Sequence, residues 1–160
     1  MSWLFPWLLF LHVLGAILAF GPTFAFPIIG GMARAEPPHA NFATRVTHTI
    51  SRRFVTPLAL TLPVTGAGLI LVRGIDLSSR ANWWLGLAIV LYVIAIGYAL
   101  FVNAPLVARM VEATSAPPPP GAAGPPPELR AMGARIGRNG MFMGLLIIVI
   151  VFLMVVKPQF

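Results

Sequence analysis

His12 is the one side chain titrating near neutral pH that lies deep within an apolar run of this 160-residue chain. A helix beginning at Trp3 would carry the imidazole about 14 Å into a hydrocarbon core that is about 30 Å thick. At that depth the ring could be an axial haem ligand, a copper ligand or a member of a proton relay. It could equally be a neutral ring that hydrogen-bonds to a neighbouring helix, with Thr61, Thr65 or Tyr92 as partner. Residue type alone leaves both interpretations open.

A haem held by two histidines would need a second imidazole at a similar depth. His39 and His48 both precede the second apolar run, and His48 would lie about 9 Å outside that run along a helix. Met141 stands at the start of the fourth apolar run and is also far from the predicted depth of His12. Single-ligand haem or a bound pigment at His12 therefore remains as the cofactor hypothesis. The methionines are scattered along the chain, whereas copper transport usually shows them clustered, so we expect no metal site.

Residue combinations typical of catalysis are missing. The chain has no cysteine, which excludes disulfides and thiolate chemistry. Its carboxylates all stand in predicted loops, so the sequence has no intramembrane acid of the kind on which proton-coupled transport relies; they are Glu36, Asp76, Glu112 and Glu128. Nucleotide-binding glycine motifs and hydrolase triads are also absent from the sequence. We therefore expect that the protein is not an enzyme.

Composition indicates that most of the exterior faces lipid. Hydrophobic residues make up 58% of the chain and charged residues only 9%, against about a quarter charged in soluble domains. The net charge of +7 does not require nucleic acid, because basic residues in short loops set orientation and contact anionic lipid headgroups. We expect a bilayer and other membrane subunits as partners, and no nucleic acid.

The apolar runs predict an all-α, polytopic membrane protein that forms one four-helix domain over residues 1–160. The spans are predicted at about 3–22, 54–72, 83–107 and 140–156. Because the second span is rich in small and hydroxyl residues, it should lie inside the bundle. The fourth is the most uniformly aliphatic and should face lipid on most sides. The first basic residue is Arg34, so the first span is predicted to be retained and not cleaved as a signal peptide.

Arginine distribution predicts the orientation. Segments 32–53 and 108–140 hold eight basic residues, and the remaining three stand on the other side. By the positive-inside rule both segments are cytoplasmic and both termini face outward, as expected in a bacterial inner membrane. Arg52, Arg53 and Arg138 flank predicted spans, where they would contact lipid headgroup phosphates or a partner.

The two cytoplasmic segments also contain amphipathic patterns. Apolar residues repeat every four positions from Asn41 to Phe54 and include Phe42, and Asn41 is placed to cap that helix. Leu129, Met132 and Ile136 form a second stripe. We expect both to lie near the headgroups, although a partner subunit could use the same faces. Between them, the proline-rich loop 115–127 reaches about 40 Å, more than neighbouring helices require.

Four sequence strings resemble a known family when taken in order. They are Leu11-His12-Val13-Leu14-Gly15-Ala16, Ser51-Arg52-Arg53-Phe54-Val55-Thr56-Pro57, Thr65-Gly66-Ala67-Gly68-Leu69 and Leu153-Met154-Val155-Val156-Lys157-Pro158. The chain resembles a bacterial family of predicted integral membrane proteins of unknown function that is distantly related to the copper-resistance D proteins. This resemblance implies a four-helix bundle and brings no established activity. Haem- or copper-handling relatives in the wider group would make His12 a ligand.

Two functions follow as hypotheses. The first is a non-catalytic accessory or scaffolding protein packed against a larger respiratory or photosynthetic membrane complex. The second is a small haem- or copper-binding redox or transport protein centred on His12.

Overall fold

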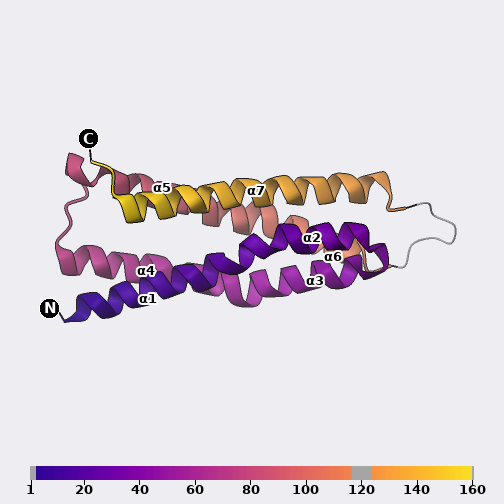
Figure 1. Cartoon of the computed structure of the whole chain (residues 1–160), viewed down its shortest axis with the longest axis horizontal. Helices are drawn as coiled ribbons and strands as arrows, with labels where there is room; N and C mark the ends of the chain where they lie inside the picture. Colours follow the sequence, from indigo (N-terminus) through magenta and orange to yellow (C-terminus); the bar gives the residue numbers. More distant parts are fainter. Residues whose placement is uncertain (1–2, 117–123, 160) are drawn as a thin grey trace.

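Each apolar run becomes part of a helix that is longer than a bilayer requires. The computed structural model describes residues 3–116 and 124–159, and within them four composite helices run side by side with no strand (Figure 1). They span Leu4–Ala35, Pro37–Arg73, Arg80–Ala113 and Pro127–Val156, and each is apolar and long enough to cross a membrane. The predicted all-α fold with four membrane spans is therefore confirmed.

Short non-α segments divide three of the composite helices. The α-helices are α1 (Leu4–Phe20), α2 (Phe26–Ala35), α3 (Ala40–Ile50), α4 (Thr56–Arg73), α5 (Trp83–Tyr98), α6 (Ala104–Ala113) and α7 (Pro127–Val156). A 3-10 segment at Gly21–Ala25 joins α1 to α2, and π-helical segments at Ser51–Val55 and Ala99–Asn103 join α3 to α4 and α5 to α6. Two further 3-10 turns, Pro37–His39 and Arg80–Asn82, precede α3 and α5.

Prolines explain where the helices are interrupted. Pro22 lies within the 3-10 segment, and Pro57 and Pro105 each follow a π-helical segment as the second residue of the next α-helix. Proline has no backbone N–H and cannot make the bond to residue i−4, so the local hydrogen-bond pattern shifts. The segment 21–25 contacts 51–55, and α7 passes against 21–25 and 99–103. We call these three segments the boundary belt.

Helix lengths place one edge of the hydrocarbon core at the boundary belt. From Trp3 to Phe24, from Phe54 to Arg73 and from Trp83 to Asn103 the helices rise about 28–31 Å, close to the roughly 30 Å of a bilayer core. The remaining helical residues continue beyond it. They form what we call the basic extension, which consists of α2, α3, α6 and residues 127–140 of α7.

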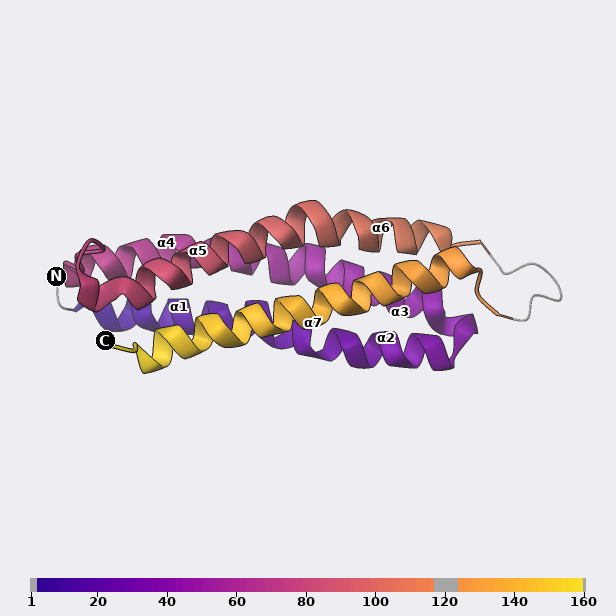
Figure 2. The ribbon, with the colours of Figure 1, turned by 90° about the horizontal axis from the view of Figure 1, so that it is seen from above.

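The two parts of the molecule pack differently (Figures 1 and 2). In the membrane part, α1 packs along α4 and α5 packs along α7. In the basic extension, α2 contacts α3, α3 contacts α6, α6 contacts α7, and α7 contacts α2, so the four helices close into a ring. The chain begins and ends at the same end of the molecule (Figure 1). Which membrane face that end occupies stays a prediction from the arginine distribution.

A core cluster near the terminal end joins the two helix pairs. Trp84, Leu85 and Ala88 of α5 bury against Leu153 of α7, and Ile70 of α4 packs against the same cluster. Few residues of the second and fourth spans are buried. Helix α4 contributes only Ala59 and Leu62 to the buried residues, whereas α7 contributes Asn139, Ile147, Ile150 and Leu153. Large apolar side chains such as Leu145, Ile148 and Val155 remain exposed on α7, so the expectation that this span faces lipid on most sides is not contradicted, and α4 packs along α1.

The expectation that the two amphipathic segments lie near the headgroups stays a prediction. These segments continue the axes of α4 and of the apolar part of α7, and their helices close the ring of the basic extension. Leu129, Met132 and Ile136 are partly buried, whereas Phe42 is exposed.

The prediction that Asn41 caps the helix α3 was wrong. Asn41 does not cap α3, and its amide instead donates to the Val111 carbonyl and the Thr114 hydroxyl, both at 3.1 Å, at the end of α6. A helix end has free carbonyls that accept such donors.

Two connecting segments remain. In the proline-rich loop predicted at 115–127, residues 117–123 lie outside the described residues. The turn after α4 begins at Gly74, which adopts a left-handed conformation with φ of 62°. This conformation favours glycine because glycine has no Cβ. Asp76 then accepts hydrogen bonds from the hydroxyl and the backbone N–H of Ser78, and these bonds lower the pKa of its carboxyl.

Tyr92 should stabilise the fold by compensating for Pro63. Pro63 lies inside α4 and leaves the Ala59 carbonyl without its intrahelical donor, and the Tyr92 hydroxyl donates to that carbonyl at 2.6 Å. We expect Tyr92→Phe to lower the free energy of unfolding by about 1 kcal/mol, because no water reaches a carbonyl at this depth. Reversible unfolding in mixed detergent micelles measures the change.

A double-mutant cycle isolates the compensation. In a Pro63→Ala background the restored N–H takes the Ala59 carbonyl, so Tyr92→Phe should cost much less there. Tyr98→Phe serves as the control and should cost the same in both backgrounds, because its hydroxyl donates to Asn139. An equal cost of Tyr92→Phe in both backgrounds would refute the compensation.

Candidate polar sites between the membrane helices

His12 lies on the face of α1 that packs against α4. Four residues of α1 form this face at spacings of four, three and four, namely Leu8, His12, Gly15 and Ala19. Such spacing keeps side chains on one side of a helix over three turns. The position of His12 in the sequence therefore directs its ring to α4.

Small residues allow α1 and α4 to approach closely. A Cβ added at Gly15 would stand 3.2 Å from a methyl carbon of Leu62, and one added at Gly68 would stand 3.2 Å from a methyl carbon of Leu8. Gly66 faces the imidazole, since a Cβ there would lie 3.4 Å from Cε1 of His12. In lipid, close backbone approach is a main source of helix association.

Thr65 is the hydrogen-bond partner of His12. Nδ1 of His12 lies 2.8 Å from Oγ1 of Thr65, and this hydroxyl also lies 3.1 Å from the Leu62 carbonyl oxygen. A hydroxyl has one proton, so a Thr65 that donates within its own helix must accept from the Nδ1–H of His12. Nε2 then carries a lone pair and has no hydrogen-bond partner among the described residues. Of the three expected partners, the structure selects Thr65; Tyr92 bonds to Ala59 instead.

No second ligand candidate is brought to His12. His48 stands in α3 within the basic extension, and His39 is paired with Glu36 at 3.1 Å in the turn before α3. Met141 is exposed on α7. Across the described residues no three side chains of the histidine, aspartate or glutamate type gather as a metal site would require.

A second polar cluster lies at the boundary belt, and the sequence reasoning missed its centre. The Tyr98 hydroxyl donates to Oδ1 of Asn139 at 2.8 Å, and the Asn139 amide donates to Oδ1 of Asn103 at 3.4 Å. Asn139 is 6% exposed, and Phe142 packs edge-on against the Tyr98 ring at 5.2 Å. Asn139 falls at the end of the segment 108–140, which was predicted to be cytoplasmic; the signal available was an asparagine directly before the fourth apolar run.

Arg52, Arg53 and Arg138 all lie at or beside the boundary belt. Arg52 and Arg53 belong to the segment 51–55, and Arg138 immediately precedes Asn139; all three are exposed. Their level matches that of lipid headgroups. Whether they bind headgroups or a partner stays a prediction.

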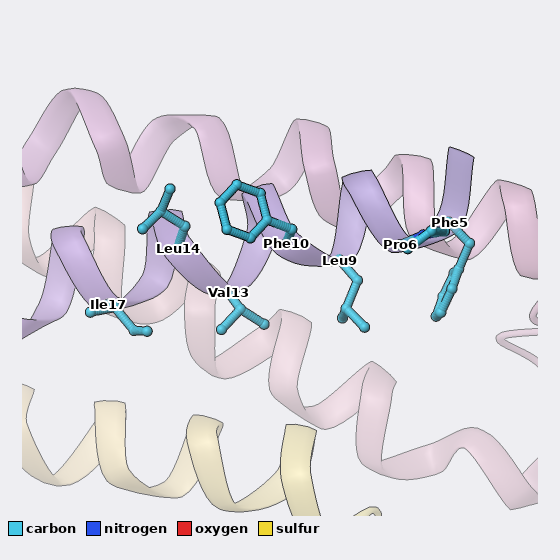
Figure 3. Close-up of a pocket in the computed structure, with 7 residues that line it drawn as sticks. All are labelled: Phe5, Pro6, Leu9, Phe10, Val13, Leu14 and Ile17. Carbon is cyan, nitrogen blue, oxygen red and sulfur yellow. The ribbon is translucent and has the colours of Figure 1, made fainter. Parts of the chain in front are cut away.

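The outer face of α1 is an entirely apolar, shallow groove of about 410 Å³ (Figure 3). It is lined by Phe5, Pro6, Leu9, Phe10, Val13, Leu14 and Ile17. His12 is not among these residues, so the groove and the histidine belong to different faces of α1. Within the membrane part, hydrocarbon chains suit such a surface.

Removing the Thr65 hydroxyl should weaken the pairing of α1 with α4. We expect Thr65→Val to lower the free energy of unfolding by about 1 kcal/mol, because His12 loses its partner, and Thr65→Ser to retain most of the stability. Unfolding in mixed micelles measures both. Thr61→Val is the matched control, since the Thr61 hydroxyl bonds the Leu58 carbonyl of its own helix at 2.7 Å. If Thr61→Val and Thr65→Val cost the same, the His12 bond contributes nothing.

Comparison with known proteins agrees with this architecture. The sequence model of DUF2269, a family of predicted integral membrane proteins, matches residues 6–158. No curated protein and no solved structure matches the chain. The match covers the boundary belt, both helix pairs and the His12 face. The protein therefore belongs to the DUF2269 family of predicted integral membrane proteins, whose function is unknown.

Proposed function

We propose that this integral membrane protein is a non-catalytic accessory or scaffolding subunit that packs against a larger respiratory or photosynthetic complex of the bacterial inner membrane. The proposal rests on the observation that polar side chains between the membrane helices form hydrogen bonds from one helix to another. His12 bonds to Thr65, Tyr92 bonds to Ala59, and Tyr98 bonds to Asn139. Each bond joins one helix to another, as a scaffold requires.

The outer surface of the membrane part supports lateral packing. Large apolar side chains project from each composite helix, with Ile17 61%, Leu71 80%, Phe101 81% and Val155 73% exposed. Lipid covers such side chains in a free protein, and the apolar helices of a partner subunit can replace that lipid without loss of hydrogen bonds. The α1 groove in Figure 3 is one such face.

Extraction in a mild detergent should recover the protein together with stoichiometric partner subunits. Native gel electrophoresis of solubilised source membranes, followed by denaturing electrophoresis in the second dimension, measures this association. We expect the chain to migrate with an assembly several times its own mass. Migration as a free monomer under the mildest extraction would contradict the proposal, and a harsher detergent that releases the monomer is the control.

A second candidate function is ligation of haem or copper by His12. The observation that favours it is the hydrogen bond at Nδ1, because ligating histidines usually hold their other ring nitrogen in this way. Nε2 is then the nitrogen that would take the ligand position. The family's proposed relation to copper-resistance proteins points in the same direction and stays a prediction.

If His12 is a haem ligand, the protein purified from its source membranes should show a Soret band that His12→Ala abolishes. Thr65→Val should shift or weaken the band, because it releases the ring from its fixed orientation. His48→Ala is the matched control and should leave the spectrum unchanged. A colourless wild type that also contains no stoichiometric copper would eliminate this candidate.

A further inference from the structure

The arginines of the basic extension and the boundary belt have no internal counterions. The two segments 32–53 and 108–140 contain eight arginines and three carboxylates, which leaves a net charge of +5. All eight arginines are exposed. In the part of the chain that the structure describes, the one ion pair joins His39 to Glu36, so none of these arginines is paired with a carboxylate.

Two of the three cations at the other end of the molecule, Arg73 and Lys157, contact aromatic rings. The Arg73 guanidinium lies 3.9 Å from the centre of the Phe5 ring, and the Lys157 ammonium lies 5.6 Å from the centre of the Trp84 ring. Cation–π contacts of this kind anchor a cation within the protein itself. By contrast, the charge of the basic extension remains available to a partner.

Distance along the helices separates three of the eight arginines, at the boundary belt, from two others farther out. Arg52, Arg53 and Arg138 lie at the boundary belt, within reach of headgroups. Arg34 lies about 15 Å beyond Phe24 along its helix, and Arg45 lies about 13 Å beyond Phe54 and about 10 Å beyond Arg52. The headgroup layer is only about 5–8 Å deep, and salt screens the membrane surface charge within about 8–10 Å. Attraction to a bilayer therefore explains why the arginines at the boundary belt are exposed. It explains the exposure of Arg34 and Arg45 only weakly.

Exposed apolar side chains lie close to the distant arginines along the chain. Phe42 is three residues before Arg45 and shares its face of α3, and Met32 is two residues before Arg34. Met32 of α2 is 59% exposed and Phe42 of α3 is 68% exposed. Phe42 lies about 18 Å along its helix from Phe54, well outside the hydrocarbon core. The positive-inside rule explains why arginines gather at this end, but it gives no reason to expose a methionine and a phenylalanine there.

We propose that the tip of the basic extension is a docking surface for an acidic, amphipathic segment of a partner subunit, on the part of that subunit outside the membrane. Carboxylates of the segment pair with Arg34 and Arg45, and its apolar residues cover Met32 and Phe42. Enrichment of methionine, aromatic residues and arginine is typical of such interfaces. The inference rests on the proposed accessory function and names where and by what chemistry the partner is held.

Site-specific photo-cross-linking in the source membranes tests the inference. A benzoylphenylalanine is placed at Met32 or Phe42, and separately at Val64 or Leu71 on the membrane part, which are 73% and 80% exposed. After irradiation, mass spectrometry identifies the peptide joined to each position. At Met32 and Phe42 we expect a protein segment in which aspartate and glutamate outnumber lysine and arginine, with apolar residues at helical spacing.

Charge variants add a quantitative criterion. Arg34→Gln together with Arg45→Gln should lower the adduct yield at Phe42 about three- to tenfold, the effect of losing two exposed ion pairs. Arg80→Gln, at the opposite end of the molecule, should leave the yield unchanged. Adducts to lipid alone, to a second copy of this chain or to a segment without excess acid would overturn the inference, as would the absence of adducts.

The outcomes also separate this inference from the accessory function. If partners co-purify and cross-link from Val64 or Leu71 but not from Met32 or Phe42, the accessory function stands and the docking surface falls. If no partner co-purifies and no position cross-links to protein, both fall. Correct folding of each variant is checked by its elution as a single species in detergent.

Discussion

A proline inside a lipid-embedded helix leaves a carbonyl that water cannot reach, and much of this structure depends on how that constraint is met. Pro63 leaves the Ala59 carbonyl without an intrahelical donor, and Tyr92 supplies one from the neighbouring helix pair. The same bond therefore repairs α4 and ties it to α5. At Pro57 and Pro105 the chain uses a different solution, in which π-helical segments take up the missing bond at the edge of the hydrocarbon core.

Close packing supplies what these few hydrogen bonds cannot. Glycines at positions 15, 66 and 68 bring α1 and α4 together, and His12 fits into this contact with its Nδ1 bonded to Thr65. The α5–α7 pair relies on larger side chains around Trp84 and Leu153. Because lipid is as apolar as leucine, neither pair gains from the hydrophobic effect within the bilayer, so contact area and satisfied polar groups determine stability.

The boundary belt separates two surfaces with different chemistry. On one side are apolar faces such as the α1 groove, and on the other is the arginine-rich basic extension. Such a division suits a subunit that contacts lipid or apolar helices within the membrane and an acidic surface outside it. The Tyr98–Asn139–Asn103 cluster lies at the junction and fixes α7 to the segment 99–103, so the orientation of the extension depends on the membrane part.

The sequence by itself determined the all-α class and the four membrane spans, because apolar runs of bilayer length are a local property. It also named Thr65 among three candidate hydrogen-bond partners of His12. The tertiary structure selected Thr65, directed Asn41 to the end of α6, buried Asn139 and extended the spans into a second bundle. These features depend on how each helix is rotated about its axis and how far it is shifted along its neighbours. Residue spacing along one chain does not specify either quantity, since both are set by the packing of side chains that are distant in sequence.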